Sequence, residues 1–502
     1  MTRSAILAIA VLAACAPTAP MTITPTPARQ RAALRWWIDS VAAAPEFRNA
    51  HWGILVIDPA RSDTIVRYNA AKLFMPASNM KIVTGGVALA QLGADYRFRT
   101  TLLATGPVVD GALRGDVVIV GRGDPTASDH MRGDAMLAML ELADSIAARG
   151  IVRIEGRIRA EGDAFPGSIY GYGWSWDEVD EPYSAGVDEL YFNEGFSRIM
   201  IRGGAFPGEP VTAAVLPSRG YPRVRIEART VPAPDSTMTA GDALVTPLSI
   251  QVVRDSAAGT VVVRGTIAPH DSQMVRFAHE APPVAYITAL KEALEARGLA
   301  VAESDSVSRG TARATLDTLA VILSPPLREI LPVFEKPSQN QIGEILLRTL
   351  GLERTGVGIP DSGRAVVERQ LLEWGVTRDG FVVRDGSGLS RYNYLSPEAI
   401  VRVLEVMQRD TAFQVFYEAM PIAGVDGTLA NRMKGTYAEA NARGKTGFVA
   451  QARSLSGYVT SADGRLLIYS LLCNNWTVPV RVVERVQDSI VARLAGMTAG
   501  SR

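Results

Sequence analysis

Hydrophobic positions near the start of the chain first follow a helical spacing and then a strand spacing. Over residues 29–44 the apolar side chains recur on one face, which predicts an amphipathic helix. Two apolar stretches at 53–58 and 63–68, separated by polar residues, predict a hairpin. A second helical pattern begins near Met75 and continues to about Leu92. The hairpin therefore delivers the chain to the start of this second helix.

The middle of the chain, residues 98–315, has a different pattern. Glycine-rich turns separate short apolar stretches there, and the predicted strands are 102–109, 113–120, 152–160, 224–228 and 260–267. Helical spacing predicts helices at 135–148 and 285–296. We expect one or two β-rich domains, inserted into a larger domain that is formed by residues 29–97 and 316–500.

After residue 316 the pattern is mainly helical, and the chain closes with two strands and a helix. The predicted helices are 341–350, 364–374 and 397–408. Apolar stretches at 455–460 and 465–473 flank Ala462-Asp463-Gly464, which predicts a hairpin. An amphipathic pattern over 478–494 predicts the last helix.

Composition and charge narrow the functional classes. A chain of 502 residues is long enough for about two to four domains with a large core. Apolar residues make up 47% and charged residues 21%, as in ordinary globular proteins. Lysine plus arginine equals aspartate plus glutamate, 52 each, so the chain lacks the positive charge expected for nucleic-acid binding. The four histidines are scattered at 51, 130, 270 and 279, so we expect no metal site and no cofactor.

The first residues are typical of an export signal. A short apolar run at 5–12 follows a basic residue and ends in Leu12-Ala13-Ala14-Cys15. This ending resembles the bacterial lipoprotein box, in which the cysteine is acylated and becomes the mature N-terminus. An ordinary signal peptide cut nearby is the alternative. Residues 16–28 predict a flexible tether. The chain has two cysteines: Cys15 would carry the lipid and Cys473 is expected to be buried, so no disulfide framework is implied. We expect an exported, periplasmic protein whose membrane contact is a lipid on Cys15.

A serine and a lysine three positions apart form the first candidate catalytic pair. Ser78 is the only serine in the sequence with a lysine, Lys81, three residues later. On a helix these positions share a face, so the lysine amine could take the hydroxyl proton and activate a weak nucleophile. At a first helical turn, the Ser78 N–H is also free to bind an oxyanion. One such pair is expected by chance in a chain of this length, so the pair needs partners elsewhere.

Two further motifs supply those partners. Ser338-Gln339-Asn340 is the only Ser-x-Asn in the chain, and Lys445-Thr446-Gly447 is the only Lys-Thr-Gly. The three motifs follow one another in the order used by serine penicillin-binding enzymes. Their joint occurrence by chance is far rarer than any single match. Lys445-Thr446-Gly447 leads into the hairpin near the end of the chain, whose edge could bind an extended peptide.

Further sequence blocks, in addition to the three motifs, extend the resemblance to penicillin-binding enzymes over almost the whole mature chain. The sequence resembles the D-alanyl-D-alanine carboxypeptidase/endopeptidase family, the low-molecular-mass penicillin-binding proteins with large insertions after Ser-x-x-Lys. The additional blocks are 75–100, 123–126, 173–177, 385–391, 424–429 and 455–459. The resemblance implies an α+β fold: a penicillin-binding-protein/β-lactamase-like transpeptidase domain with an antiparallel sheet between helical layers. It also implies an inserted domain, with a further domain nested in the insert.

The resemblance also implies acyl transfer to a serine. Ser78 would attack the carbonyl of the penultimate D-Ala with Lys81 as its base, and Ser338 would relay a proton to the leaving amine. Burial and a nearby lysine cation would lower the pKa of Lys81, as a base near pH 7 requires. The other implied substrate-binding residues are Asn340 for the amide, Lys445, Thr446 and Gly447 for the carboxylate side, and the Phe448 N–H for the oxyanion.

Two further positions are implied to frame the substrate pocket, and two depart from the family pattern. Asp177 and Arg391 would bind the zwitterionic end of the stem peptide's diamino acid, with a structural charge pair as the alternative. Gln339 replaces the usual aspartate, and we expect its side chain to point away from the reaction. Phe448 replaces the usual threonine and removes a hydroxyl that could bind the substrate carboxylate.

The implied partners are peptidoglycan peptides and β-lactam antibiotics. A β-lactamase would share the acylation step but needs a group that activates water, and the sequence identifies none. A non-catalytic penicillin-binding cell-wall protein is the second alternative, although Ser78 and Lys81 are both intact. An α/β-hydrolase is disfavoured because the chain has no Gly-x-Ser-x-Gly motif.

Overall fold

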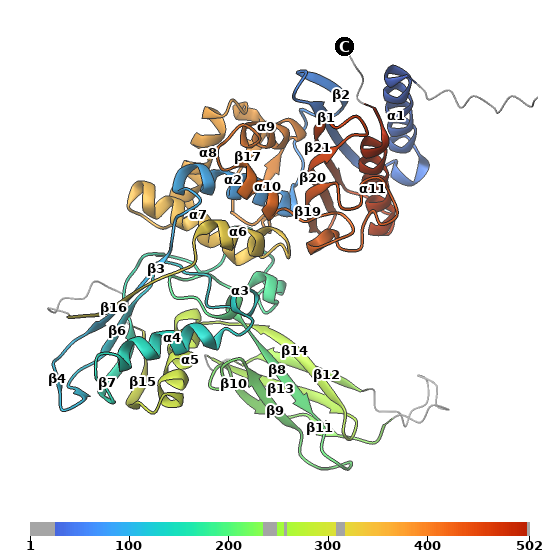
Figure 1. The fold of residues 1–502 in the computed structure, drawn as a ribbon. Helices are drawn as coiled ribbons and strands as arrows, with labels where there is room; N and C mark the ends of the chain where they lie inside the picture. Colours follow the sequence, from blue (N-terminus) through green and yellow to red (C-terminus); the bar gives the residue numbers. More distant parts are fainter. Residues whose placement is uncertain (1–25, 234–247, 256–258, 308–316, 499–502) are drawn as a thin grey trace, which may run out of the picture.

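The computed structural model describes residues 26–233, 248–255, 259–307 and 317–498. Figure 1 shows an elongated molecule with an upper region formed by both ends of this chain and a lower region formed by its middle. The expected signal peptide at 1–15 and most of the expected tether lie outside the described residues. The tether prediction is two residues too long at its end, because helix α1 begins at Pro27.

The upper region is built on a five-stranded sheet with the order β19-β20-β21-β1-β2. Its strands are β1 (His51–Asp58), β2 (Asp63–Tyr68), β19 (Arg443–Val449), β20 (Ala452–Thr460) and β21 (Leu466–Asn474). All neighbouring strands are antiparallel, which confirms the expected sheet. Because β1 pairs with β21, the N-terminal hairpin joins the C-terminal strands, and β19 is left at an edge.

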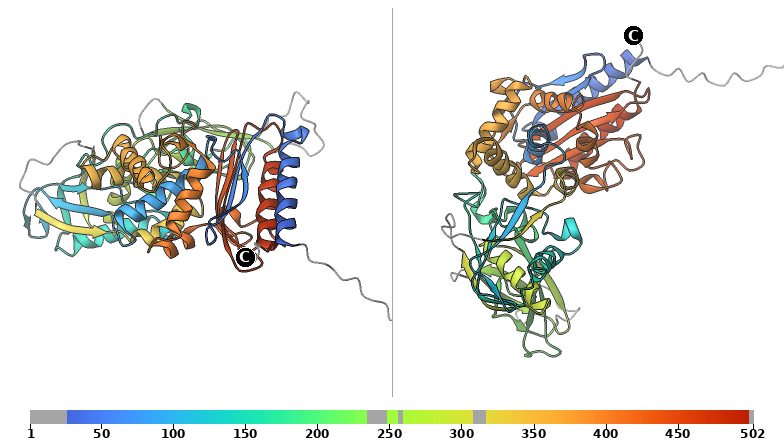
Figure 2. Two further views of the ribbon diagram at one scale, coloured as in Figure 1. Left: turned by 90° about the horizontal axis from the view of Figure 1, so that it is seen from above. Right: turned by 60° about the vertical axis from the view of Figure 1, so that its left-hand side comes forward.

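Helices cover both faces of this sheet, as the view from above shows (Figure 2). On one face α1 (Pro27–Ala42) lies beside α11 (Val480–Gly496), and their apolar sides share a core. On the other face α2 (Met80–Leu92) and α9 (Pro397–Met407) bury a second core. The α+β fold with a sheet between helical layers is therefore confirmed.

The other elements of the upper region complete the helical layer around α2. They are η2 (Ala77–Asn79), α6 (Leu327–Glu335), α7 (Asn340–Thr355), α8 (Pro360–Glu373), β17 (Phe381–Val382), β18 (Tyr394–Leu395) and α10 (Phe413–Ala419). Helices α2 and α6 approach closely at Gly85, where a Cβ would lie 2.9 Å from Glu335 Oε1 and 3.5 Å from the Phe334 ring.

A seven-stranded sheet forms most of the lower region, with the order β16-β3-β6-β7-β5-β4 and β15 beside β7. Its strands are β3 (Arg99–Ala104), β4 (Val108–Val109), β5 (Ala112–Leu113), β6 (Val117–Val120), β7 (Arg153–Ala160), β15 (Ala300–Val307) and β16 (Asp317–Leu323). The accompanying helices are α3 (Asp129–Arg132), α4 (Met136–Ala147) and α5 (Pro282–Ala296). Because β16 pairs with β3, the insertion ends after Leu323, and the boundary expected at residue 315 is too early.

Two smaller sheets lie at the far end of the lower region (Figure 1). Their strands are β8 (Phe196–Arg202), β9 (Thr212–Leu216), β10 (Arg223–Ile226), β11 (Arg229–Thr230), β12 (Ser249–Arg254), β13 (Thr260–Ile267) and β14 (Ser272–Ala278). They enclose a separate core that includes Ile199, Val263 and Phe277. The chain enters this unit after β7 and returns to α5, so the unit is nested within the insertion.

Candidate active site

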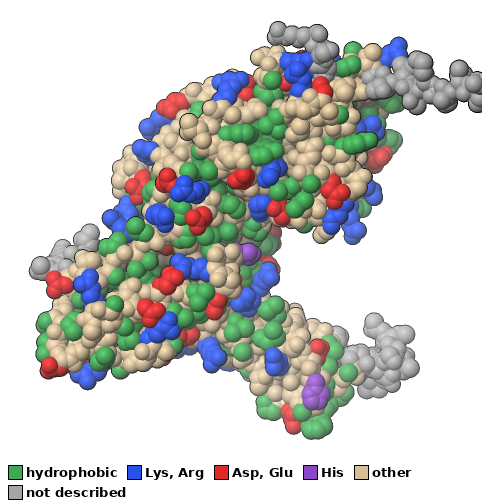
Figure 3. Space-filling model, viewed as in Figure 1, with side chains coloured by type: hydrophobic (Ala, Val, Ile, Leu, Met, Phe, Trp, Pro, Cys, Tyr) green, Lys and Arg blue, Asp and Glu red, His purple; other side chains and the backbone are tan. Residues whose placement is uncertain are grey.

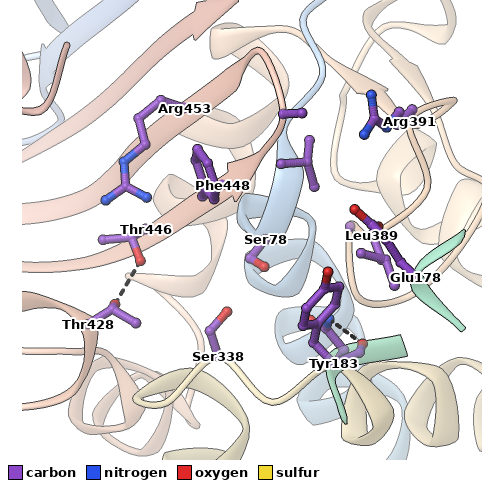
Figure 4. A pocket seen from close by; sticks show the side chains of 14 residues that line it. Ser78, Glu178, Tyr183, Ser338, Leu389, Arg391, Thr428, Thr446, Phe448 and Arg453 are labelled. Carbon is purple, nitrogen blue, oxygen red and sulfur yellow. Dashed lines mark hydrogen bonds between the residues drawn. The ribbon is translucent and has the colours of Figure 1, made fainter. Parts of the chain in front are cut away.

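A cavity of about 560 Å³ lies beside the edge strand β19 (Figure 4). Its walls come from η2, the segment between α6 and α7, the loop 385–391, the β19–β20 hairpin and two insertion residues, Glu178 and Tyr183. The lining includes five residues named from the sequence motifs: Ser78, Ser338, Asn340, Thr446 and Phe448. Residues from distant parts of the sequence thus share one cavity.

Ser78 lies in η2, immediately before α2, where the chain makes a tight turn. Ala77 has φ 46°, a left-handed conformation that costs a residue with a Cβ about 1–2 kcal/mol. The adjacent strand β19 approaches this turn so closely that a Cβ on Gly447 would lie 2.8 Å from Ser78 N. Asn79 fixes this approach, because its Nδ2 donates to Lys445 O at 2.7 Å. The turn that carries Ser78 and the edge strand β19 are therefore held together.

Lys81 occupies the first turn of α2 and is fully buried. Its Nζ lies 2.7 Å from Asn340 Oδ1, 2.7 Å from the Ser387 carbonyl oxygen and 3.0 Å from Ser78 Oγ. A neutral amine has two N–H groups and one lone pair. It can donate to the amide and carbonyl oxygens, which only accept, and accept the hydroxyl proton of Ser78. Burial lowers the pKa of Lys81 to about 8, although Glu335, Asp385 and Glu344 act to raise it.

Ser338 enters the cavity from the segment before α7, and Asn340 enters it as the first residue of α7. Ser338 has φ 66°, and its hydroxyl lies on the Ser78 side of the cavity in Figure 4. Asn340 Oδ1 accepts from Lys81, and Asn340 Nδ2 donates to the backbone oxygen of Tyr183 at 2.8 Å. Asn340 therefore links the lysine to the insertion, in addition to the substrate contact expected from the sequence. Gln339 caps α7 through Ile342 N, away from the reaction, as expected.

The Lys-Thr-Gly motif lies within the edge strand β19 rather than ahead of it. Lys445 is fully buried, and its Nζ donates to the Thr446 carbonyl oxygen at 3.0 Å. Burial, followed by the charge of Lys81, lowers the pKa of Lys445. Thr446 Oγ1 donates to Thr428 Oγ1 at 2.7 Å (Figure 4). The Phe448 ring is 55% exposed in the cavity mouth.

Two buried carboxylates that we did not single out from the sequence shape the loop 385–391. Asp385 Oδ1 accepts from Gly388 N at 2.8 Å, and Asp385 Oδ2 accepts from Ser390 N at 2.6 Å. Glu344 Oε1 accepts from Ser387 N at 2.8 Å. These bonds hold the Ser387 carbonyl where Lys81 donates to it. The block 385–391 was visible in the sequence, but its pattern gave no role to either carboxylate.

The structure places only one residue of the expected pair Asp177 and Arg391 at the cavity. Arg391 lines it, whereas Asp177 is exposed and is not part of the lining. The neighbouring residue Glu178 lines the cavity instead (Figure 4). Both acids belong to the 3₁₀ helix η3 (Trp176–Glu178), where consecutive side chains diverge by about a third of a turn. The structure therefore places Glu178, one position after the acid expected from the sequence, at the cavity.

The described residues contain no cluster of three or more His, Cys, Asp or Glu side chains arranged for a metal ion. Cys473 is buried, as expected. Across the same described ranges, no helix combines the length and apolar character needed to span a membrane.

Comparisons with known proteins show which proteins this chain resembles. A D-alanyl-D-alanine carboxypeptidase from an Actinomadura species is 33% identical over 480 residues, 92% of this chain and 84% of the relative. D-alanyl-D-alanine carboxypeptidase DacB from Haemophilus influenzae is 26% identical over 453 residues, 88% of each protein.

A solved structure and a family model complete the comparison. The crystal structure of penicillin binding protein 4 from Haemophilus influenzae matches with a TM-score of 0.72 and 23% identity, covering 86% of this chain and 92% of that one. The model of the D-Ala-D-Ala carboxypeptidase 3 (S13) family matches residues 34–497. The chain therefore belongs to the D-Ala-D-Ala carboxypeptidase 3 (S13) family.

Proposed function

We propose that Ser78 is the nucleophile with which this serine-type D-alanyl-D-alanine carboxypeptidase cleaves peptidoglycan stem peptides through an acyl-enzyme. The observation that carries this assignment is the set of three contacts made by Lys81 Nζ, which suits a neutral base beside the Ser78 hydroxyl. The buried position of Lys81 supports it, because a lysine in water is protonated at neutral pH.

In the acylation step, the Ser78 Oγ–H proton passes to Lys81 Nζ while Oγ bonds to the carbonyl carbon of the penultimate D-Ala. The resulting oxyanion would be bound by the N–H groups of Ser78 and Phe448. The close approach of β19 at Gly447 supports this pairing of donors. When the C–N bond breaks, the proton held by Lys81 returns to the leaving amine through the Ser338 hydroxyl.

In the deacylation step, water attacks the same carbonyl carbon and the Ser78 ester bond breaks. Lys81 again takes the proton and returns it to Ser78 Oγ, which regenerates the free enzyme. If the leaving amine is a single D-Ala, the reaction is a carboxypeptidase reaction. If the amine belongs to a cross-linked neighbouring peptide, the same chemistry is an endopeptidase reaction.

We infer that substrate recognition uses both ends of the cavity. Lys445 and Thr446 would bind the carboxylate of the terminal D-residue, and Phe448 contributes its ring instead of a hydroxyl. At the other end Glu178 and Arg391 would bind the ammonium and carboxylate of the stem peptide's diamino acid. Their opposite charges and their position in the lining support this assignment.

A stem peptide ending in D-Ala-D-Ala tests this function. We expect stoichiometric release of D-Ala by the wild-type protein and none by Ser78→Ala. A β-lactamase, the alternative, would release bound penicillin rapidly without cleaving the peptide. A non-catalytic binding protein would do neither.

We also propose that Cys15 anchors the exported protein to a membrane on the periplasmic side. Residue 15 lies outside the described residues, so the support is the Leu-Ala-Ala-Cys sequence. Acyl chains contribute about 0.8 kcal/mol per buried CH₂, so several chains bind a membrane firmly. Cys15→Ser should release soluble or unprocessed protein from cells. A mature wild-type N-terminus downstream of Cys15 would contradict the proposal.

A further inference from the structure

Two arginines line the cavity, and the mechanism above uses only one of them. Arg391 is assigned to the diamino acid, whereas Arg453, from strand β20, has no part in that mechanism. Lys445, which is proposed to bind the terminal carboxylate, is fully buried and is not one of the lining residues. Its Nζ donates to the Thr446 carbonyl oxygen. Among the described residues, Arg453 is therefore the cation that the β19–β20 hairpin presents to the cavity.

The register of the hairpin places Arg453 beside the residue that follows Lys-Thr-Gly. Arg453 is the direct cross-strand partner of Phe448, so their side chains share a face of the sheet. The guanidinium carbon of Arg453 lies 5.7 Å from the centre of the Phe448 ring. Figure 4 shows Arg453 and Thr446 on one side of Ser78. Arg391 lies on the other side, so the two arginines can bind opposite ends of one substrate.

The Arg453 guanidinium keeps hydrogen-bonding capacity for a ligand. A guanidinium has five N–H donors. Nη2 donates to Glu484 of α11, and Nη1 makes a long contact of 3.4 Å with the Gly447 carbonyl oxygen. Glu484 therefore holds the side chain in place, while further N–H groups of Nη1 and Nη2 remain for a carboxylate. An arginine binds a carboxylate with two parallel hydrogen bonds, which gives geometric specificity.

Arg453 also keeps its positive charge at neutral pH. Burial, followed by the charge of Arg432, lowers the pKa of Arg453 to about 10, so the guanidinium remains protonated at pH 7. Burial and the charge of Lys81 lower the pKa of Lys445 to about 7, so that amine is only partly protonated at the same pH. A carboxylate that binds at neutral pH is therefore better matched by Arg453 than by Lys445.

We propose that Arg453 is a specificity-determining residue, whose guanidinium binds the carboxylate of the terminal D-residue beside Thr446. The guanidinium supplies a contact that the Phe448 side chain cannot make, because a phenyl ring has no hydroxyl donor. The inference deepens the proposed function and rests on it, since that function determines which end of the cavity receives the terminal carboxylate.

Loss of the guanidinium should weaken binding of a peptide acid more than binding of its amide. Arg453→Met keeps an unbranched apolar side chain and removes the charge. We expect KM for a D-Ala-D-Ala peptide to rise by about ten- to a hundredfold, with kcat changed by less than about threefold.

Binding without turnover gives a second measurement. In a Ser78→Ala background, dissociation constants are measured for two peptides that differ only in a C-terminal carboxylate or carboxamide. The ratio of the amide constant to the acid constant should fall by about tenfold or more in Arg453→Met. A purely structural role of Arg453 would change both constants equally and leave this ratio unchanged.

Two further variants serve as controls, after thermal unfolding has shown that each is folded. Arg453→Lys keeps the charge but loses the planar fork, so the ratio should fall by about threefold. Arg432→Met is the matched control, because Arg432 also pairs with α11, through Asp488, and is not part of the lining. It should leave KM and the ratio unchanged. If Arg453→Met does not fold, the ratio in Arg453→Lys decides the question.

The ratio also separates failure of this inference from failure of the proposed function. An unchanged ratio in Arg453→Met, or in Arg453→Lys if the former does not fold, would overturn the inference. An equal fall of the ratio in Arg432→Met would overturn it too, because the effect would not be specific to the lining arginine. A wild-type protein that released no D-Ala would refute the proposed function, whereas a ratio that still depended on Arg453 would support the carboxylate contact.

Discussion

The indole Nε1 of Trp174 donates a hydrogen bond of 3.0 Å to Asp385 Oδ2. Trp174 belongs to the insertion, and Asp385 organises the loop 385–391 that forms one wall of the cavity. One carboxylate therefore sets the shape of this wall and joins it to the segment that carries Glu178. The insertion contributes to the site through this contact as well as through its own lining residues.

Trp174→Phe should weaken peptide binding more than penicillin acylation. The substitution keeps an aromatic ring and removes the N–H that binds Asp385, a hydrogen bond to a charged group that contributes about 1.5–3 kcal/mol. We expect KM for a stem peptide to rise about tenfold, with the penicillin acylation rate within about twofold of the wild type. Trp176→Phe is the matched control, because Trp176 is 84% exposed. Equal effects of the two substitutions on KM would argue against a role for the Trp174–Asp385 hydrogen bond in peptide binding.

Glu178→Gln should reduce the affinity for stem peptides whose diamino acid has a side chain with a zwitterionic end. Loss of the carboxylate removes the partner for the ammonium, and we expect KM to rise about tenfold, equivalent to about 1.4 kcal/mol. Asp177→Asn should have no effect, since Asp177 is not part of the lining. Kinetics with a matched peptide that lacks the side-chain ammonium provide the control. A larger effect of Asp177→Asn would reinstate the assignment made from the sequence.

The rate of acylation by penicillin should depend on pH through Lys81. Burial lowers the pKa of Lys81 to about 8, and only the neutral amine can take the Ser78 proton. The rate constant should therefore rise with pH between about 6 and 8, by about tenfold per unit well below the pKa. Burial and the charge of Lys81 lower the pKa of Lys445 to about 7, so loss of its proton weakens binding of the penicillin carboxylate within the same pH range. The measurement therefore uses saturating penicillin, which isolates the chemical step. Stopped-flow measurement of acylation would contradict this account if the rate were flat from pH 6 to 8.

Phe448→Thr should improve carboxylate recognition without changing the chemical step. The threonine hydroxyl could donate to the substrate carboxylate, while the backbone N–H of position 448 would remain. We expect KM for D-Ala-D-Ala peptides to fall by up to about tenfold, with kcat nearly unchanged. Phe448→Val is a control that removes the ring without adding a hydroxyl. A flat KM, or a larger change in kcat, would indicate that the ring packs against the bound peptide.

The sequence predicted the two hairpins, the main helices and the motif residues because each had a local pattern, whereas the complete antiparallel sheet was implied by the family resemblance. The nested unit was harder to predict. In β8 the buried Ile199 and Ile201 alternate with Arg198 and Arg202. The two isoleucines are buried by strands of the neighbouring sheet, which the pattern of β8 alone does not indicate.

Charged and polar residues are spread over the surface seen in Figure 3 and form no patch of one sign that would mark a site.

The supporting residues of the site could not be predicted for a related reason. Glu335, Glu344 and Asp385 reach the site through tertiary packing, far from Lys81 in sequence, and no spacing rule links them to it. The choice between Asp177 and Glu178 depends on how a single 3₁₀ turn is oriented. Motif spacing identified the residues proposed to react, and the structure was needed to find those that hold them in place.

The central claim is that Lys81 activates Ser78, and mapping the penicillin adduct tests it most directly. Peptide mass spectrometry after a brief exposure to benzylpenicillin should find the adduct on Ser78 in the wild type and no adduct in Ser78→Ala. In Lys81→Ala, with an unchanged melting temperature, we expect acylation to be slower by a factor on the order of 10³ or more. An adduct on another residue, or acylation of Lys81→Ala at the wild-type rate, would contradict the account.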